Sequence, residues 1–178
     1  IFVLADFYRS TYAANSVGKR NVGPKTADGV VVGAVDAGIM VNAIETAAIS
    51  LGYGMTVIGA IRSSLKEFSK MLGLPKYVIP IVGAALGVPK DRPLSRLKPR
   101  VPFDSFVFFD KYDAKKVEEG VEEHEKDMVA WRKENNTSQL PTYKEMIVRI
   151  YENPHNKLVE SLKSQGFDVL DEIEIDEK

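Results

Sequence analysis

The sequence has 178 residues, 44% hydrophobic and 28% charged, which is ordinary for one soluble globular domain with a sizeable core. Its 24 basic and 25 acidic residues nearly cancel, so no electrostatic case exists for binding nucleic acid or an anionic membrane surface. It contains no cysteine, which excludes disulfides, thiol catalysis and cysteine-based metal sites. The two histidines, His124 and His155, lack ligand-like spacing, so we expect both at the surface and no metal site.

The chain opens with an apolar segment, residues 1–7, whose pattern predicts a strand. We recognise in it none of the basic, apolar and small-residue regions of a signal peptide. We therefore expect a cytoplasmic protein whose sequence opens within a domain, as a fragment of something longer would. Residues 9–26 are polar and contain the breakers Gly18, Gly23 and Pro24, so we predict an exposed loop there.

The most apolar stretch covers residues 27–51 and predicts a long helix. A transmembrane span needs roughly 20 apolar residues with few charges. Here Asp28, Asp36, Asn42 and Glu45 interrupt the stretch, and its many glycines and alanines favour close packing. We therefore expect no membrane span, but a helix buried at the heart of a soluble protein or between two subunits.

Short elements follow the long helix. Residues 52–54 end it, residues 55–58 predict a strand, and residues 59–62 predict a turn. Ser64 and Glu67 have the spacing of a capping box and predict a helix to about Leu72. The remaining expectations are a strand over residues 77–86 broken by Pro80 and Gly83, a proline-rich connection over residues 88–102, and an extended segment over residues 106–109.

The C-terminal part is more charged. Residues 113–134 predict a helix with one partly apolar side, carrying Val117, Val121, His124, Met128 and Trp131. Two further helices are predicted by their start signals: a capping box at residues 142–145, and the pair Asn153-Pro154 before a helix that ends at Gly166. We expect the acidic residues 171–178 to fray or to form an edge strand.

Several motifs of catalytic or nucleotide-binding proteins fail on inspection. The Gly18-Lys19 pair lacks the other glycine and the hydroxyl residue of a P-loop, and the glycines give no G-x-G-x-x-G pattern. The carboxylate pairs at residues 118–119 and 122–123 could suggest acid–base catalysis. On a charged helix such pairs are more often solvated, and we predict that here.

Four blocks, in register along the chain, resemble the nitroreductase superfamily, in particular its NADPH-flavin oxidoreductase and oxygen-insensitive nitroreductase branch. The blocks are Gly52-Tyr53-Gly54-Met55-Thr56-Val57-Ile58-Gly59-Ala60-Ile61-Arg62, Leu72-Gly73-Leu74-Pro75, Val78-Ile79-Pro80-Ile81-Val82-Gly83-Ala84-Ala85-Leu86-Gly87-Val88-Pro89 and Leu97-Lys98-Pro99-Arg100-Val101-Pro102. The resemblance implies an α+β fold with a central, mainly antiparallel sheet flanked by helices, in an intertwined homodimer joined through the helix at 27–51. It also implies one domain over residues 1–178 without its N-terminal segment, with a flavin-site core at 1–112 and a helical extension at 113–178.

The resemblance implies FMN as cofactor and assigns residues to it. Val57, Ile58, Gly59 and Ala60 correspond to a turn whose backbone amides face the N5 and O4 edge of the flavin ring. Small residues suit this position because the backbone must approach a flat ring closely. Taken without the resemblance, Gly59-Ala60 is better explained as an ordinary tight turn.

Basic residues are assigned to the rest of the site by the same resemblance. Lys98 and Arg100 are similar to a pair that binds the FMN phosphate, and two cations one residue apart on an extended backbone can point to the same side. An ordinary basic surface loop is the alternative. Arg62 resembles a basic residue beside the cofactor, the substrate edge or the dimer contact.

The implied activity is reduction of nitroaromatics, quinones or flavins by NADPH or NADH, with hydride passing through flavin N5 and no catalytic side chain. The branch contacts the extra phosphate of NADPH with arginines in a loop, and here residues 133–138 hold one base beside an acid, so use of NADH is also expected. The alternative hypothesis is a flavin-free fragment that serves as a non-catalytic dimerising or structural module.

Overall fold

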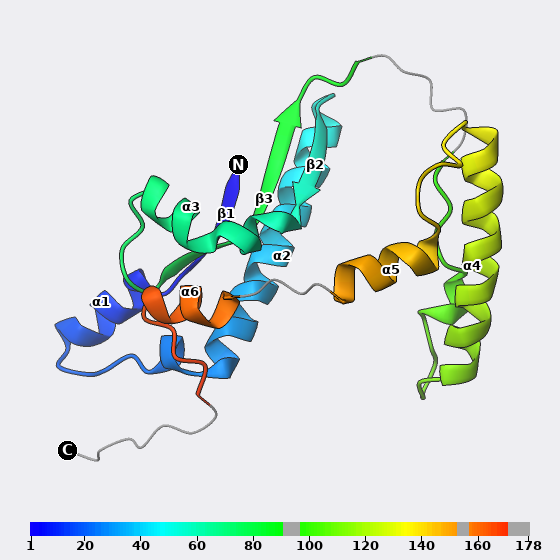
Figure 1. Cartoon of the computed structure of the whole chain (residues 1–178). Coiled ribbons are helices and arrows are strands. Elements are labelled where there is room, and N and C mark those ends of the chain that lie inside the picture. The colour runs from blue at the N-terminus through cyan, green and yellow to red at the C-terminus, as the bar shows by residue number, and fades with distance from the viewer. Residues whose placement is uncertain (91–96, 153–156, 171–178) are drawn as a thin grey trace. The chain divides into compact units, whose positions relative to one another are not determined.

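The computed structural model describes residues 1–90, 97–152 and 157–170. These residues form two compact units, one made of Ile1–Lys90 with residues 157–170, the other of residues 97–152. The first unit contains a sheet with helices around it, and the second is helical (Figure 1). The predicted boundary between residues 112 and 113 stays a prediction.

The sheet of the first unit has three strands in the order β1-β3-β2. β1 (Phe2–Asp6) and β2 (Gly54–Ile58) both pair antiparallel with the central strand β3 (Val78–Gly87). The predicted break at Pro80 and Gly83 was wrong, since β3 is continuous over ten residues. Pro80 pairs with Leu4 beside a register shift, and such an irregularity accommodates a residue that cannot donate to the ladder.

Helix α2 (Ala27–Ser50) packs on this sheet through small residues. Its N-terminus is capped by Thr26, whose Oγ1 accepts a hydrogen bond from the Gly29 amide at 2.9 Å. A Cβ atom at Gly33 would lie 2.7 Å from the Cβ of Ala5, so the helix approaches β1 more closely than any side chain would allow. The buried residues of α2 are Gly29, Gly33, Ala37 and Ala48.

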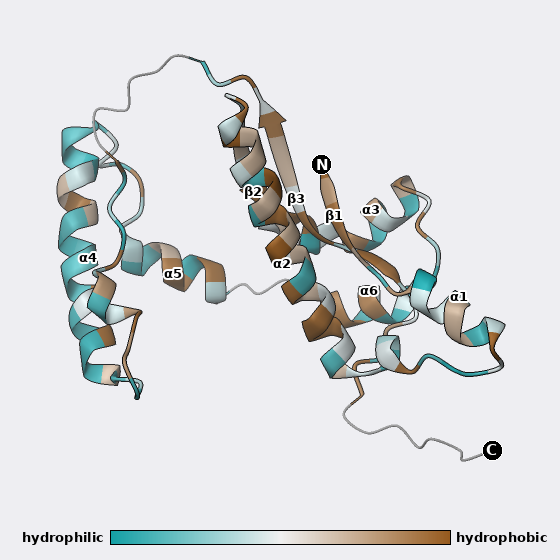
Figure 2. Cartoon of the chain, turned by 180° about the vertical axis from the view of Figure 1, so that it is seen from behind, coloured by the Kyte–Doolittle hydropathy of each residue, from teal (hydrophilic) through white to brown (hydrophobic). Residues whose placement is uncertain are grey.

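Most of the rest of α2 is exposed in this chain, apart from partly buried residues such as Val30, Val41 and Ile44, so the helix is not buried on all sides within the chain. Its burial between two subunits stays a prediction. Figure 2 shows hydrophobic residues along much of α2, and the side chains of Val35 and Ile39 are 55% and 65% exposed. By length and composition the helix could cross a membrane, with 22% of its most apolar window buried. Its stripe of glycine and alanine against the sheet is instead the packing of a helix within a folded domain. The cytoplasmic location stays a prediction.

The core of the first unit draws on both ends of the chain. Helix α6 (Leu158–Ser164) contributes Leu162, and Phe167 after it is fully buried against β1, β3 and the helix α3 (Leu65–Met71). Lys25 and Asp168 form a salt bridge of 2.6 Å, and the Tyr77 amide donates to the Gln165 carbonyl. The described C-terminal residues are therefore an integral part of this unit.

Two predictions about the connections in the first unit were wrong. Helix α1 (Tyr8–Ser16) lies within the predicted loop, and the Asp6 carboxylate begins it by accepting a hydrogen bond from the Tyr8 amide at 2.8 Å. Helix α1 buries no residue, so it has no apolar periodicity to detect. Helix α3 starts where expected, but Ser64 makes no side-chain capping bond, so the predicted capping box is absent there.

The second unit is built on helix α4 (Ala114–Glu134), which is capped by the Asp113 carboxylate. Helix α5 (Tyr143–Tyr151) starts with the predicted capping box of Thr142 and Glu145, which is confirmed. Residues 106–109 follow the short 3₁₀ helix Phe103–Ser105 as a turn and a bend, so the extended prediction was wrong. The predicted helix start at residues 153–154 and the acidic tail from residue 171 lie outside the described residues.

His124 is buried between α4 and α5, which corrects the expectation of a surface residue. Its ring meets the Tyr143 ring edge-on at 4.7 Å between centroids. The apolar side predicted for α4 is real, with Met128 buried beside His124 along it. A histidine in a charged segment is expected at the surface, but its position on the apolar side of α4 decides its burial. His155 lies outside the described residues.

Candidate functional site

The predicted site turn lies where β2 ends and a 3₁₀ helix, Gly59–Ser64, begins. β2 is an edge strand, and its last residues Val57 and Ile58 are 43% and 40% exposed. Ile61 points the other way and is buried. Its Cγ2 lies 3.0 Å from the position that a Cβ of Gly83 would take, so the turn is anchored on β3 from behind. The turn therefore presents residues 57–60 outward from a fixed support.

Arg62 folds back over this turn. A Cβ atom at Gly59 would lie 3.2 Å from Nη1 and 3.3 Å from Nη2 of Arg62. The missing side chain at Gly59 thus lets a guanidinium group lie close to the backbone. The structure therefore brings together Val57, Ile58, Gly59, Ala60 and Arg62 as one continuous surface at the end of the edge strand.

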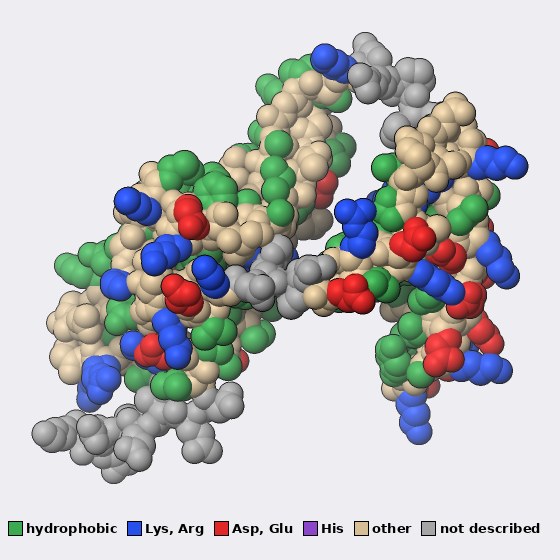
Figure 3. Space-filling view, in the orientation of Figure 1, with side chains coloured by type: hydrophobic (Ala, Val, Ile, Leu, Met, Phe, Trp, Pro, Cys, Tyr) green, Lys and Arg blue, Asp and Glu red, His purple; other side chains and the backbone are tan. Residues whose placement is uncertain are grey.

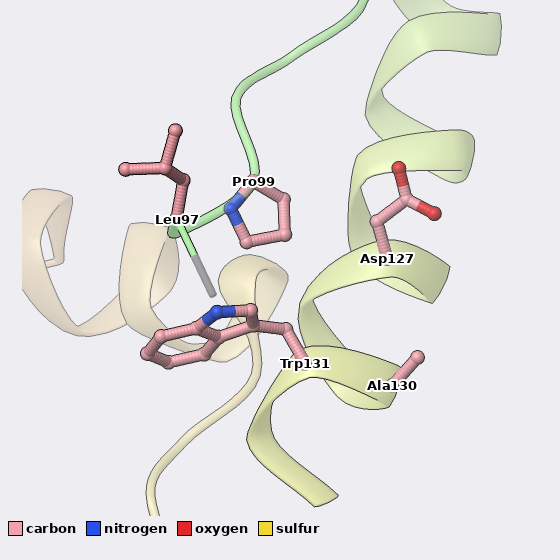
Figure 4. Close-up of a pocket in the computed structure, with 5 residues that line it drawn as sticks. All are labelled: Leu97, Pro99, Asp127, Ala130 and Trp131. Atoms are coloured by element: carbon pink, nitrogen blue, oxygen red, sulfur yellow. The ribbon is translucent and has the colours of Figure 1, made fainter. Parts of the chain in front are cut away.

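Lys98 and Arg100 belong to the second unit and are described within it. Both are exposed, and they alternate along the chain with Leu97 and Pro99. Leu97 and Pro99 line a hollow of about 380 Å³ against α4, together with Asp127, Ala130 and Trp131 (Figure 4). Lys98 and Arg100 are not among the residues that line it, and the expectation that they point to the same side stays a prediction.

The last turn of α4 contains a buried residue that the sequence did not indicate. Arg132 is buried, and its Nη1 donates to the Leu140 carbonyl at 3.0 Å. Asn135 Nδ2 donates to the Trp131 carbonyl at 2.7 Å and closes the end of the helix. The guanidinium of Arg132 thus holds the loop at 135–140 against the end of the helix. Arg132 lies in a charged run, which carries no signal that this one base is buried.

The acidic residues of α4 are arranged for solvation and helix packing. The pairs at 118–119 and 122–123 are exposed, as predicted. Burial acts to raise the pKa of Glu125, but hydrogen bonds from the Thr142 side chain and the Lys144 amide, with the Lys144 charge, lower it below its ordinary value of 4.5. In the part of the chain that the structure describes, no three His, Cys, Asp or Glu residues are placed to hold a metal ion.

Comparison with known proteins places this geometry in a family. The model of the nitroreductase family matches residues 22–88, and the model of the C-terminal domain of the nitroreductase family matches residues 98–169. The oxidoreductase YcnD of Bacillus subtilis, a hypothetical oxidoreductase of known structure, is 32% identical with a TM-score of 0.86, over 93% of this chain and 68% of that one. The chain belongs to the nitroreductase family.

Other members of the nitroreductase family extend the comparison. The structure of NfrA2 of Bacillus megaterium is 30% identical with a TM-score of 0.86, covering 94% of this chain and 68% of that one. An NADPH-dependent oxidoreductase of Staphylococcus saprophyticus is 35% identical over 118 residues, which are 65% of this chain and 46% of that protein. The match thus spans less than half the length of this curated relative.

These matches bear on the sequence-based expectations. The resemblance to the nitroreductase family and the α+β fold with an antiparallel sheet flanked by helices are confirmed. The predicted turn falls inside the first matched segment, and Lys98, Arg100 and Trp131 fall inside the second. The roles of the individual site residues stay predictions.

Proposed function

We propose that this chain acts in an FMN-dependent NAD(P)H oxidoreductase that reduces nitroaromatics, quinones or flavins by hydride transfer through flavin N5. The observation that carries the proposal is the turn at residues 57–60, which exposes small and apolar residues at the end of an edge strand and is anchored from behind by Ile61. Family membership supports it, and the relative from Staphylococcus saprophyticus is named for the use of NADPH.

The residues of the turn fit a flat, electron-accepting ring. Gly59 carries no side chain and Ala60 carries one methyl group, so backbone amides there can approach a ring edge closely. Arg62 places a cation within reach of the same backbone. Amide and guanidinium donors suit the acceptor atoms along the flavin edge, and Lys98 and Arg100 suit a phosphate.

In this proposal the protein binds and orients the cofactor, and FMN, when bound, supplies the hydride-transfer chemistry. Val57 and Ile58 form an apolar border that excludes water from the ring. The amides at Gly59 and Ala60 donate to acceptor atoms and stabilise negative charge as it develops. Lys98 and Arg100 neutralise the phosphate. No side chain needs to act as an acid or base.

We also propose that the protein is a homodimer joined through α2. Figure 3 shows hydrophobic side chains gathered along β2, β3 and the adjoining end of α2. Val31, Val35 and Ile39 on α2 are each more than half exposed. Contiguous apolar surface of this kind marks an interaction site. A second copy of the chain fits this surface, because a two-fold interface brings together the same patch from each of the two subunits.

The exposed side of α2 also favours the alternative function, a flavin-free dimerising module, because that surface needs no cofactor. The two proposals differ in catalysis. With added FMN, the enzyme proposal expects NADPH or NADH to be consumed in step with the reduction of a quinone such as menadione. A dimer that shows no FMN-dependent consumption of either nucleotide would favour the structural module.

A further inference from the structure

The loop that carries Lys98 and Arg100 rests against the last turns of α4. Figure 4 shows the Pro99 ring above the indole ring of Trp131, with Leu97 beside it and Asp127 on the helix. Leu97, Pro99 and Trp131 line the same hollow of about 380 Å³. The hollow lies between the loop and α4, and Pro99 and Trp131 border it from the two sides.

The backbone of the loop transmits this contact to the two cations. Proline fixes its own φ angle and keeps the preceding residue, Lys98, extended. Along an extended chain successive side chains point to opposite sides. Pro99 borders the hollow with Trp131, whereas Lys98 and Arg100 are exposed and do not line it; their alternation with Pro99 along the chain directs them to the side away from the indole.

Trp131 is well suited to support the loop. The Nε1 atom is fully buried and has no hydrogen-bond partner among the described residues. Such a buried, unpaired donor costs free energy, so its hydrogen-bonding capacity is not what the position uses. The Trp131 carbonyl accepts from Asn135 at 2.7 Å, which fixes the helix end that carries the indole. The flat ring thus serves as a rigid surface.

We propose that Trp131 is a positioning residue for the phosphate-binding pair: by supporting Pro99, it directs Lys98 and Arg100 to one side. This inference rests on the proposed function, because it needs the pair to bind the FMN phosphate. It concerns the phosphate alone. The ring of the flavin is assigned to the turn at residues 57–60.

The test compares FMN with riboflavin, which lacks the phosphate, by measuring both dissociation constants from quenching of flavin fluorescence. The wild type binds FMN more tightly, and Lys98→Ala with Arg100→Ala makes the two flavins equal. Trp131→Ala weakens FMN about tenfold, the effect of losing one charge-assisted hydrogen bond, and leaves riboflavin within about twofold. Trp131→Phe keeps a flat ring without the N–H and retains the wild-type ratio.

Two further variants complete the test, one as an independent check and one as a control. Pro99→Ala removes the ring from the loop side without touching the helix, and it reproduces the loss for FMN even if Trp131→Ala fails to fold. Val129→Ala is the control, on the same helix but not lining the hollow. A wild-type ratio of FMN to riboflavin affinity in both Trp131→Ala and Pro99→Ala overturns the positioning role and leaves the proposed function intact. A wild type that binds neither flavin overturns both.

Discussion

The turn at Gly59 can be tested by adding a single methyl group. In Gly59→Ala the new Cβ lies 3.2 Å from Nη1 and 3.3 Å from Nη2 of Arg62, which is tight but meets the far end of a flexible side chain. Gly59 is not among the glycines with a left-handed φ angle, so its backbone tolerates alanine. We therefore expect the free energy of unfolding to change by less than about 1 kcal/mol.

The same methyl group should weaken FMN binding much more than folding. It separates the ring from the backbone donors and displaces Arg62 from its place over the turn. Loss of one such hydrogen bond is worth about 1.5 kcal/mol, or about tenfold in the dissociation constant. Quenching of FMN fluorescence measures the affinity, and thermal unfolding followed by circular dichroism measures the stability. Val129→Ala, at an exposed position of α4 in the second unit, is the control.

Adding Arg62→Ala separates the two contributions. Because Gly59→Ala already displaces the guanidinium, we expect the double variant to bind FMN within about twofold of Gly59→Ala alone, so that the two effects are not additive. Fully additive losses would mean that Arg62 acts elsewhere than over Gly59. Wild-type FMN affinity in Gly59→Ala would refute the close approach of the backbone to the ring.

Three further predictions concern packing, assembly and pH. Gly33→Ala should lower the free energy of unfolding by about 1–3 kcal/mol, since its Cβ would lie 2.7 Å from that of Ala5. Gly38→Ala, on the open side of the same helix, should raise it by up to about 1 kcal/mol. Thermal unfolding measures both changes. Ile39→Glu, on the exposed side of α2, should convert the dimer to a monomer in sedimentation experiments, and an unchanged sedimentation coefficient would place the interface elsewhere. Because the pKa of Glu125 is lowered in the folded protein, its ionised carboxylate stabilises the fold above the ordinary pKa of 4.5. This stabilisation is lost as the pH falls through the pKa of the folded state. The difference in unfolding free energy between the wild type and Glu125→Gln should therefore shrink between about pH 5 and pH 3.

The sequence predicted the elements whose signals are local and strong. The apolar run at 27–51 and the capping box at residue 142 correspond to α2 and α5 within a residue or two. The edge-strand turn after β2 was found through a motif and not through periodicity. In each case neighbouring residues in the chain carry the information, so no tertiary contact is needed to read it.

The wrong predictions share one physical cause: each of these features depends on contacts between residues that are distant in the sequence. Pro80 and Gly83 look like strand breakers, but a register shift opposite Leu4 and the side chain of Ile61 accommodate them. Arg132 looks like one more surface base, yet its guanidinium binds the Leu140 carbonyl. The support of Pro99 by Trp131 joins residues more than thirty positions apart, so no local pattern could reveal it.

The most direct test of the central claim is an absorbance spectrum of the purified protein after incubation with FMN and desalting. The account predicts that the visible flavin bands remain with the protein and bleach when NADPH or NADH is added without oxygen. A protein that emerges colourless would contradict the assignment of a flavin site to these residues.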